Sequence, residues 1–189
     1  MNKHTRILVL AISLLPFFSR AQQIVSQQAK VDFDAYQNLV SEVKEHRKSK
    51  LLSLDDFIKA SKQKDVLILD TRSDEMYANK HIKGAVHLNF SDFTQANLAK
   101  VIPALTTKIL IYCNNNFDGD EVNFATKAVV PSMVTSDVKE LTLALNIPTY
   151  INLYGYGYRN VFELSEFISV YDKRVEFEGK LVKKLTNKR

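Results

Sequence analysis

Short apolar runs alternate along this chain with polar segments in which apolar residues recur at helical spacing. The runs Val66–Asp70 and Lys108–Cys113 are apolar at nearly every position, which is typical of strands buried on both faces of a sheet. Leu51–Leu52, Gly84–Leu88 and Thr149–Leu153 are predicted as further strands. Strands that alternate with helices indicate an α/β fold with a mainly parallel sheet and helices on both faces.

Helices are expected between these strands, where apolar residues recur every three or four positions. Serine or aspartate at the start of several of them is a favourable N-cap. In chain order the predicted helices are Asp34–Lys48, one capped by Ser53, Ser73–Asn79, one from Ser91 to about Lys100, Glu121–Val130, one capped by Asp137, and Asn160–Ser169. Pro131 separates the two helices that precede the last strand.

The first 21 residues have the pattern of a secretory signal peptide. Lys3 and Arg6 give a positive start, Ile7–Phe18 is an apolar run, and Ser19–Ala21 places small residues at the minus-three and minus-one positions of a cleavage site. The run is shorter than the roughly 20 residues that span a bilayer. The prediction is export to the periplasm or the medium, with no membrane attachment after cleavage. An uncleaved membrane anchor is the alternative.

Composition and charge are those of an ordinary globular domain. The chain has 189 residues, of which 46% are apolar, enough for one domain with a real core. The formal net charge is +5, but the first 21 residues carry three basic and no acidic side chains. The remaining chain has 23 basic against 21 acidic side chains. This small excess argues against nucleic acid as a partner.

Cys113 is the only cysteine of the chain, and it stands where the run Lys108–Cys113 ends. Export implies an oxidising compartment, in which thiols usually pair. A single cysteine cannot pair within its chain, so it is buried, joined to another chain, or kept free for chemistry. Asn114–Asn116 follow at once. A strand that ends at a thiol, followed by a polar loop and a helix, presents a nucleophile at the ligand-binding edge of a parallel sheet.

Three segments resemble the rhodanese-like domain family. They are Leu69-Asp70-Thr71-Arg72 with Glu75 and His81-Ile82-Lys83-Gly84-Ala85-Val86, then Ile109-Leu110-Ile111-Tyr112-Cys113, and then Asn152-Leu153-Tyr154-Gly155-Tyr156-Gly157. The last of them is similar to the final strand and glycine turn of that family. The resemblance spans about Leu51 to Ile168 and implies the three-layer rhodanese-like sandwich. The expected organisation is a signal peptide (1–21), a lead-in segment with an N-terminal helix (22–48), a rhodanese-like domain (49–170) and a basic C-terminal tail (171–189).

The resemblance implies a sulfurtransferase in which Cys113 takes a sulfane sulfur from a small donor and passes it to a thiol acceptor. No cofactor is implied. The loop would surround the sulfur with backbone N–H groups and neutral side-chain donors, since asparagines suit a tight cradle. The loop residues assigned to this role are Asn114, Asn115, Asn116, Phe117, Asp118 and Gly119. The alternative is that the asparagines only form a turn.

The loop departs from the family pattern because it has no basic residue before Lys127. The missing basic residue also counts against a cysteine phosphatase, which needs an arginine there to hold a dianion. The expected donor is therefore neutral or weakly charged, such as a persulfide or polysulfide. Asp118 is predicted to cap a helix with Glu121, although acidic residues here also repel an anion. Arg159, after the glycine turn, is the best nearby cation to replace the missing one.

Asp70 and Arg72 are expected to form a structural ion pair that braces the strand end beside the cysteine loop. His81 and His87 lie on a turn and a strand without metal-ligand spacing, so no metal site is assigned. The segment 121–146 is longer than the family requires and is either a docking surface for a protein partner, a lid, or a surface insertion without function.

Two further hypotheses stand beside the sulfurtransferase. In the first, the domain is a catalytically silent module that uses the fold to bind a partner; the missing loop cation favours this hypothesis. In the second, it is a thiol redox protein that forms an intermolecular disulfide through Cys113.

Overall fold

The computed structural model describes residues 29–127 and 144–182. The chain divides into residues 1–32 and a compact unit of residues 33–189. The predicted signal peptide, residues 1–21, lies outside the described residues. The elements of the compact unit are α1 (Phe33–Arg47), β1 (Leu51–Leu52), α2 (Leu54–Ser61), β2 (Val66–Asp70), α3 (Asp74–Asn79), β3 (His81–Ile82), β4 (Val86–His87), the 3-10 turn η1 (Phe90–Asp92), α4 (Gln95–Val101), β5 (Lys108–Tyr112), η2 (Asn114–Asn116), β6 (Phe117–Asp118), α5 (Asn146–Gly155), β7 (Val161–Leu164), β8 (Ile168–Ser169) and β9 (Phe177–Glu178).

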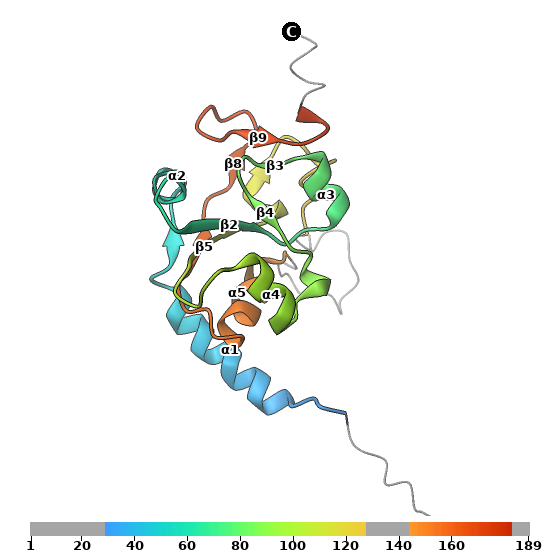
Figure 1. The fold of residues 1–189 in the computed structure, drawn as a ribbon. Coiled ribbons are helices and arrows are strands. Elements are labelled where there is room, and N and C mark those ends of the chain that lie inside the picture. Colours follow the sequence, from blue (N-terminus) through green and yellow to red (C-terminus); the bar gives the residue numbers. More distant parts are fainter. Residues whose placement is uncertain (1–28, 128–143, 183–189) are drawn as a thin grey trace, which may run out of the picture. The chain divides into compact units, whose positions relative to one another are not determined.

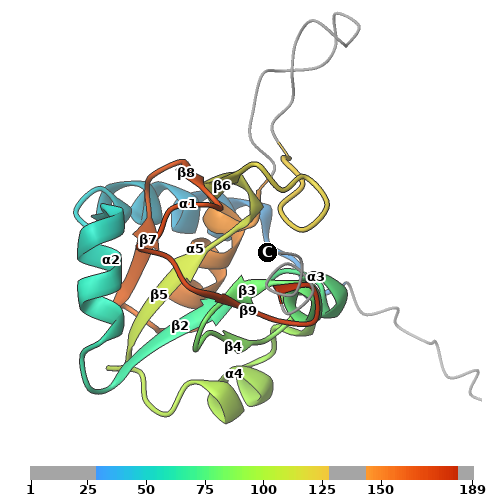
Figure 2. The same ribbon diagram turned by 90° about the horizontal axis from the view of Figure 1, so that it is seen from above.

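The central sheet is parallel and has the strand order β1-β7-β5-β2-β4 (Figure 2). Strand β5 lies in its middle, where Val66–Asp70 on one side and Val161–Glu163 on the other pair with it. Two small pairs complete the strands: β3 with β9, antiparallel, and β6 with β8, parallel. The expected mainly parallel sheet is confirmed. Its order brings the carboxyl ends of β7, β5 and β2 to one edge, where ligands bind in such folds.

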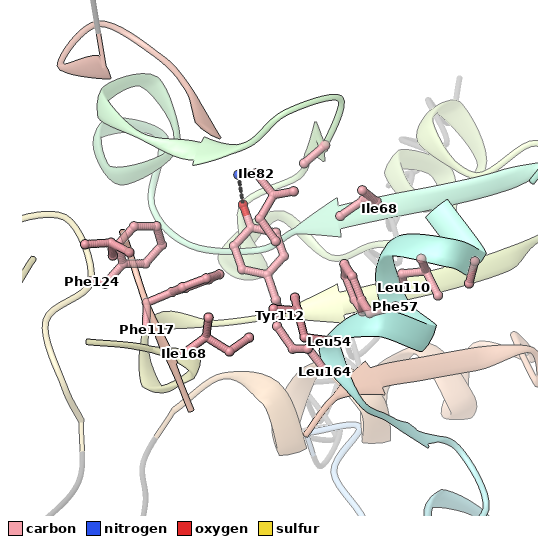
Figure 3. Packing of buried hydrophobic residues seen from close by; sticks show 13 residues of the cluster. Leu54, Phe57, Ile68, Ile82, Leu110, Tyr112, Phe117, Phe124, Leu164 and Ile168 are labelled. Carbon is pink, nitrogen blue, oxygen red and sulfur yellow. Dashed lines mark hydrogen bonds between the residues drawn. The ribbon is translucent and has the colours of Figure 1, made fainter. Parts of the chain in front are cut away.

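The sheet is covered on both faces, so the molecule has three layers (Figure 1). Helices α1, α4 and α5 pack on one face over a core that includes Leu69, Ile109 and Tyr150. Helix α2 and the small strand pairs cover the other face. Figure 3 shows this second core, in which Tyr112 lies beside Leu54 of α2 and Leu164 of β7, and Phe117 lies beside Phe124 and Ile168. This architecture agrees with the predicted α/β class and places each central strand between two apolar layers.

Several predicted elements form where the pattern placed them. Helix α1 spans Phe33–Arg47, close to the predicted Asp34–Lys48. The Ser53 side chain accepts a hydrogen bond from the backbone N–H of Asp56 and caps α2. The Ser73 side chain caps α3 in the same way. No helix among the described residues has the length and apolar character that a membrane crossing requires.

The end of the domain differs from the prediction. Thr149–Leu153 was expected as the last strand but lies inside helix α5, which buries Thr149, Tyr150, Ile151 and Leu153. The glycine turn closes this helix: the N–H of Gly157 bonds the carbonyl of Tyr154, and that of Tyr158 bonds the carbonyl of Leu153. This is a Schellman cap, and Gly157 supplies its positive φ of 99°.

The last strands are likewise not the expected helix. Asn160–Ser169 was predicted as one helix, but it forms strands β7 and β8. The strand pattern is hard to recognise because Glu163 is charged and yet buried in the sheet, where its carboxylate is paired with Arg47. A pattern that counts Glu163 as a solvent-facing residue therefore misses the apolar run.

Three smaller predictions are also corrected. Ser91 lies inside the 3-10 turn Phe90–Asp92 and caps nothing, and Thr94 caps α4 instead. Residues 121–127 are turns and irregular backbone rather than helix. The helix assigned to Asp137 lies almost wholly outside the described residues. The domain also continues past residue 170: Val175 and Phe177 pack on the core, so the described part of the predicted tail is a component of the fold.

Candidate functional site

Cys113 directly follows the middle strand β5 and begins the turn η2, at the carboxyl edge of the sheet. We call residues 113–119 the cysteine loop. The thiol is enclosed, since Cys113 is only 1% exposed. The Cys113 sulfur thus lies at the predicted edge of the parallel sheet, but other residues of the same chain cover it.

The backbone N–H of Leu145 donates a hydrogen bond to Cys113 Sγ at 3.3 Å. The backbone amide of Asn114 also lowers the pKa of the thiol. Leu145 is the N-cap residue of α5, so the positive end of this ten-residue helix faces the sulfur. Leu145 is not among the residues that the sequence assigned to this site. No local signal marks Leu145, because it follows Cys113 by 32 residues and meets it only through the fold.

The asparagines hold the loop together rather than the sulfur. Asn116 accepts hydrogen bonds at Oδ1 from the Cys113 N–H, at 2.9 Å, and from Asn146 Nδ2, at 3.1 Å. Its own Nδ2 donates to the carbonyls of Leu164 and Glu166. Asn115 Oδ1 accepts from the backbone N–H of Lys127. The expectation that the Asn116 side-chain amide donates to the sulfur is therefore wrong, because both of its N–H groups donate to backbone carbonyls in β7 and directly after it.

The second half of the cysteine loop leaves the sulfur and joins the core. Phe117 is buried and packs its ring edge-on against Tyr112. Asp118 is exposed in strand β6, and Gly119 makes the next turn with φ 88°. Asp118 does not cap a helix. Asp120 accepts the N–H of Asn123 within the turn that follows, and it pairs with Lys80 at 2.9 Å.

Asp70 and Arg72 form the expected structural ion pair beneath the cysteine loop. Arg72 Nη2 lies 2.6 Å from Asp70 Oδ2, and both side chains are at most 2% exposed. The remaining donors of Arg72 bond the carbonyls of Lys80 and Asn123. The hydroxyl of Tyr112, next to the cysteine, donates to Asp70 at 2.5 Å. Every charged group in this cluster is paired and hydrogen-bonded, as buried charges must be.

Arg159 does not replace the missing loop cation. It precedes β7, whose Val161 pairs with Ile109 at the start of β5, so it lies at the sheet edge opposite Cys113. Its guanidinium covers the Tyr154 ring at 3.5 Å and donates to the Tyr154 carbonyl. The prediction failed because the glycine turn ends helix α5 instead of following a strand.

Burial raises the pKa of the Cys113 thiol, and the amides of Leu145 and Asn114, together with the Arg72 charge, counter only part of this effect. Asp70 adds to the rise. The resting thiol is thus protonated at neutral pH, although two dipoles point at the sulfur.

The histidines that the structure describes do not form a metal site: His81 hydrogen-bonds the Tyr77 carbonyl, which is a structural role. Within residues 29–127 and 144–182 no group of three or more His, Cys, Asp or Glu side chains could hold a metal ion.

Comparisons with known proteins show the family of this chain. The family model described as Rhodanese-like domain matches residues 53–172. Two crystal structures are similar at low identity: the BH2092 protein from Bacillus halodurans (16% identity, TM-score 0.45, covering 78% of this chain and 86% of that one) and the Alr3790 protein from Anabaena sp. (17% identity, TM-score 0.43, 73% and 100%). A comparison with curated protein sequences finds no match. Because the family model covers more than half of the chain, the chain belongs to the rhodanese-like domain family.

Proposed function

We propose that this protein is a sulfurtransferase or persulfide carrier in which Cys113 is the nucleophile. The observation that carries the proposal is the backbone N–H of Leu145, at the helix α5 N-terminus, which donates a hydrogen bond to the Cys113 sulfur. Amide donors and a helix dipole favour a thiolate or a persulfide anion. This arrangement supports sulfur chemistry at Cys113 without a metal or a loop cation.

The donor is a neutral or weakly charged persulfide or polysulfide. In the transfer, the Cys113 thiolate attacks the outer sulfur of the donor, a new S–S bond forms on Cys113, and the donor S–S bond breaks. The donor leaves as a thiolate, which takes up the proton that Cys113 has lost. Thiosulfate is a poor donor here, because the loop residues Asn114–Gly119 bring no positive charge to its sulfonate.

Mass spectrometry of the intact protein tests this chemistry. After incubation with a polysulfide, the wild-type protein should gain the mass of one sulfur atom, and a thiol reductant should remove it. Cys113→Ser should gain nothing, and thiosulfate should label the wild type much more slowly. A wild-type protein that no sulfane donor labels would refute the proposal.

A binding module without catalysis is the second candidate, and the enclosed thiol favours it. Cys113 is 1% exposed, and burial raises its pKa. Alkylation rates separate the two candidates: a silent module should react with iodoacetamide more slowly than a free thiol at every pH. The partner of such a module would be a protein that binds the segment 121–146.

Export belongs to the proposal as well. The pattern of residues 1–21 supports a cleaved signal peptide and a periplasmic or secreted protein. Amino-terminal sequencing of the protein from the native host should begin at Gln22. A chain that still starts at Met1 would contradict cleavage.

A further inference from the structure

A pocket of about 310 Å³ lies beside the cysteine loop, at the carboxyl edge of the sheet. Its walls come from the end of α1, the ends of β1 and β7, the cysteine loop and the start of α5. The lining includes Arg47, Leu51, Asn115, Asn146, Ile147 and Glu163. Helix α1 precedes the matched family region, residues 53–172, so this wall is contributed by a segment outside it.

Arg47 is the cation of this pocket, and Glu163 fixes its orientation. Its Nε and Nη2 atoms lie 2.5 Å and 2.7 Å from the two carboxylate oxygens of Glu163. The Glu163 side chain is only 5% exposed, whereas that of Arg47 is 28% exposed. Among the described residues, Nη1 makes no hydrogen bond. The bidentate pair thus holds a planar fork in one orientation and leaves an edge of it for a ligand.

The geometry points to this pocket as the site that binds a small thiol acceptor by its carboxylate, with Arg47 as the residue that recognises the carboxylate. The cation is on α1, and Asn115 and Asn116 of the cysteine loop line the same pocket. A small thiol that carries a carboxylate has both a group for Arg47 and a sulfur nucleophile, whereas thiosulfate lacks the carboxylate. The exposed side chains of Leu51 and Ile147 offer apolar contact to its carbon chain.

This inference rests on the proposed persulfide chemistry and names its acceptor. The acceptor thiolate attacks the outer sulfur of the Cys113 persulfide. A new S–S bond forms on the acceptor, the bond between the two sulfurs on Cys113 breaks, and Cys113 takes up the proton that the acceptor thiol released. The sulfane sulfur moves without change of its oxidation level, so the step needs no added oxidant or reductant.

The test uses two probes that differ in the carboxylate, N-acetylcysteine and its amide, bound to Cys113→Ser protein and measured by NMR titration. The acid should bind about tenfold more tightly than the amide. The double variant Arg47→Met with Glu163→Gln, added to Cys113→Ser, should bring the two affinities together. Both charges are removed because Arg47→Met alone would leave Glu163 buried and unpaired. Arg174→Met is the matched control, since this arginine pairs with Asp172 and Asp55 away from the pocket and should keep the preference.

Equal binding of acid and amide, including no binding of either, would overturn the acceptor site. A preference that persists in the double variant would overturn the role of Arg47. Neither result depends on persulfide formation, because the Cys113→Ser protein carries no thiol at this position. A wild-type protein that binds the acid selectively but never gains sulfur would instead refute the proposed function and leave the carboxylate site standing.

Discussion

Two buried polar groups lie next to each other around the end of β5, and the fold satisfies them in opposite ways. Asp70 meets a full countercharge from Arg72 at 2.6 Å and a hydroxyl from Tyr112. Cys113, one residue after Tyr112, meets backbone amides from Leu145 and Asn114. The Asp70 carboxylate is thus stabilised by an opposite charge, whereas an anion at Cys113 would be stabilised by backbone dipoles.

The difference separates structure from chemistry in this site. A carboxylate that is paired in the interior is locked, and removing its partner is costly. Around Cys113 the amides of Leu145 and Asn114 favour the anion more than the Arg72 charge does. Burial still raises the pKa of the thiol, so it stays protonated at rest, yet the amides can bind an anion that forms there. Arg72 is paired with Asp70 and Lys80 with Asp120, so neither charge is free to pair with a thiolate. Sulfur chemistry at Cys113 therefore depends on backbone geometry.

The largest expected effect is that of breaking the charged group. Arg72→Met leaves the buried Asp70 carboxylate without its partner and should lower the free energy of unfolding by about 3–5 kcal/mol. Urea denaturation measures it. Arg72→Lys keeps a charge but loses the fork that reaches the carbonyls of Lys80 and Asn123, so its loss should be smaller. A loss below about 1 kcal/mol for Arg72→Met would show that Asp70 is not held by charge.

Removing the side chain of Asn116, which links the cysteine loop to β7, should lower the stability by less. Asn116→Ala deprives the Cys113 N–H and the Leu164 carbonyl of their buried partners and should cost about 2 kcal/mol of stability. Asn115→Ala is the matched control, because Asn115 is less buried and its side chain makes one hydrogen bond to the residues that the structure describes, from the Lys127 N–H. Denaturation of both variants decides the point. Equal losses would mean that Asn116 has no special place in the loop.

Sequence patterns sufficed for the first part of the domain and failed in the last. Val66–Asp70 and Lys108–Cys113 are apolar at almost every position because both faces of each strand are covered, so local pattern and global fold agree. Thr149–Leu153 is equally apolar and rich in strand-forming residues, but it is a helix packed on the same sheet. Periodicity cannot distinguish a short buried helix from a buried strand.

The site was predictable to the extent that it is local. Cys113 at a strand end and the Asp70–Arg72 pair lie two residues or fewer from their strands, and the sequence placed both correctly. Leu145 was missed because it contacts Cys113 from 32 residues downstream. Arg47 was missed because it lines the pocket beside the loop from a helix that precedes the domain. Such long-range contacts leave no periodic trace in one sequence.

Taking away the main dipole should affect reactivity more than stability. Leu145 has φ −74°, which proline also adopts, so Leu145→Pro removes the N–H that donates to Cys113 Sγ while the backbone keeps its course. The thiolate loses one hydrogen bond, and the rate of alkylation at a fixed alkaline pH should fall about tenfold. Leu145→Ala retains the N–H and is the control. If both variants react alike, the amide does not support the thiolate.

The smallest effect is the pH dependence of stability that the buried thiol contributes. An unfolded cysteine titrates near pH ~8.5, and burial raises the pKa of Cys113 in the folded chain. Between these two values the unfolded chain has lost the proton and the folded chain has kept it. The free energy of unfolding therefore falls as pH rises through this window, by at most about 1.4 kcal/mol per pH unit. Denaturation of wild type and Cys113→Ser at matched pH isolates this contribution, since both proteins share the tyrosines that titrate at higher pH. A wild type that gains stability over Cys113→Ser above pH ~8.5 would mean that the dipoles outweigh burial and that the folded thiol is an anion.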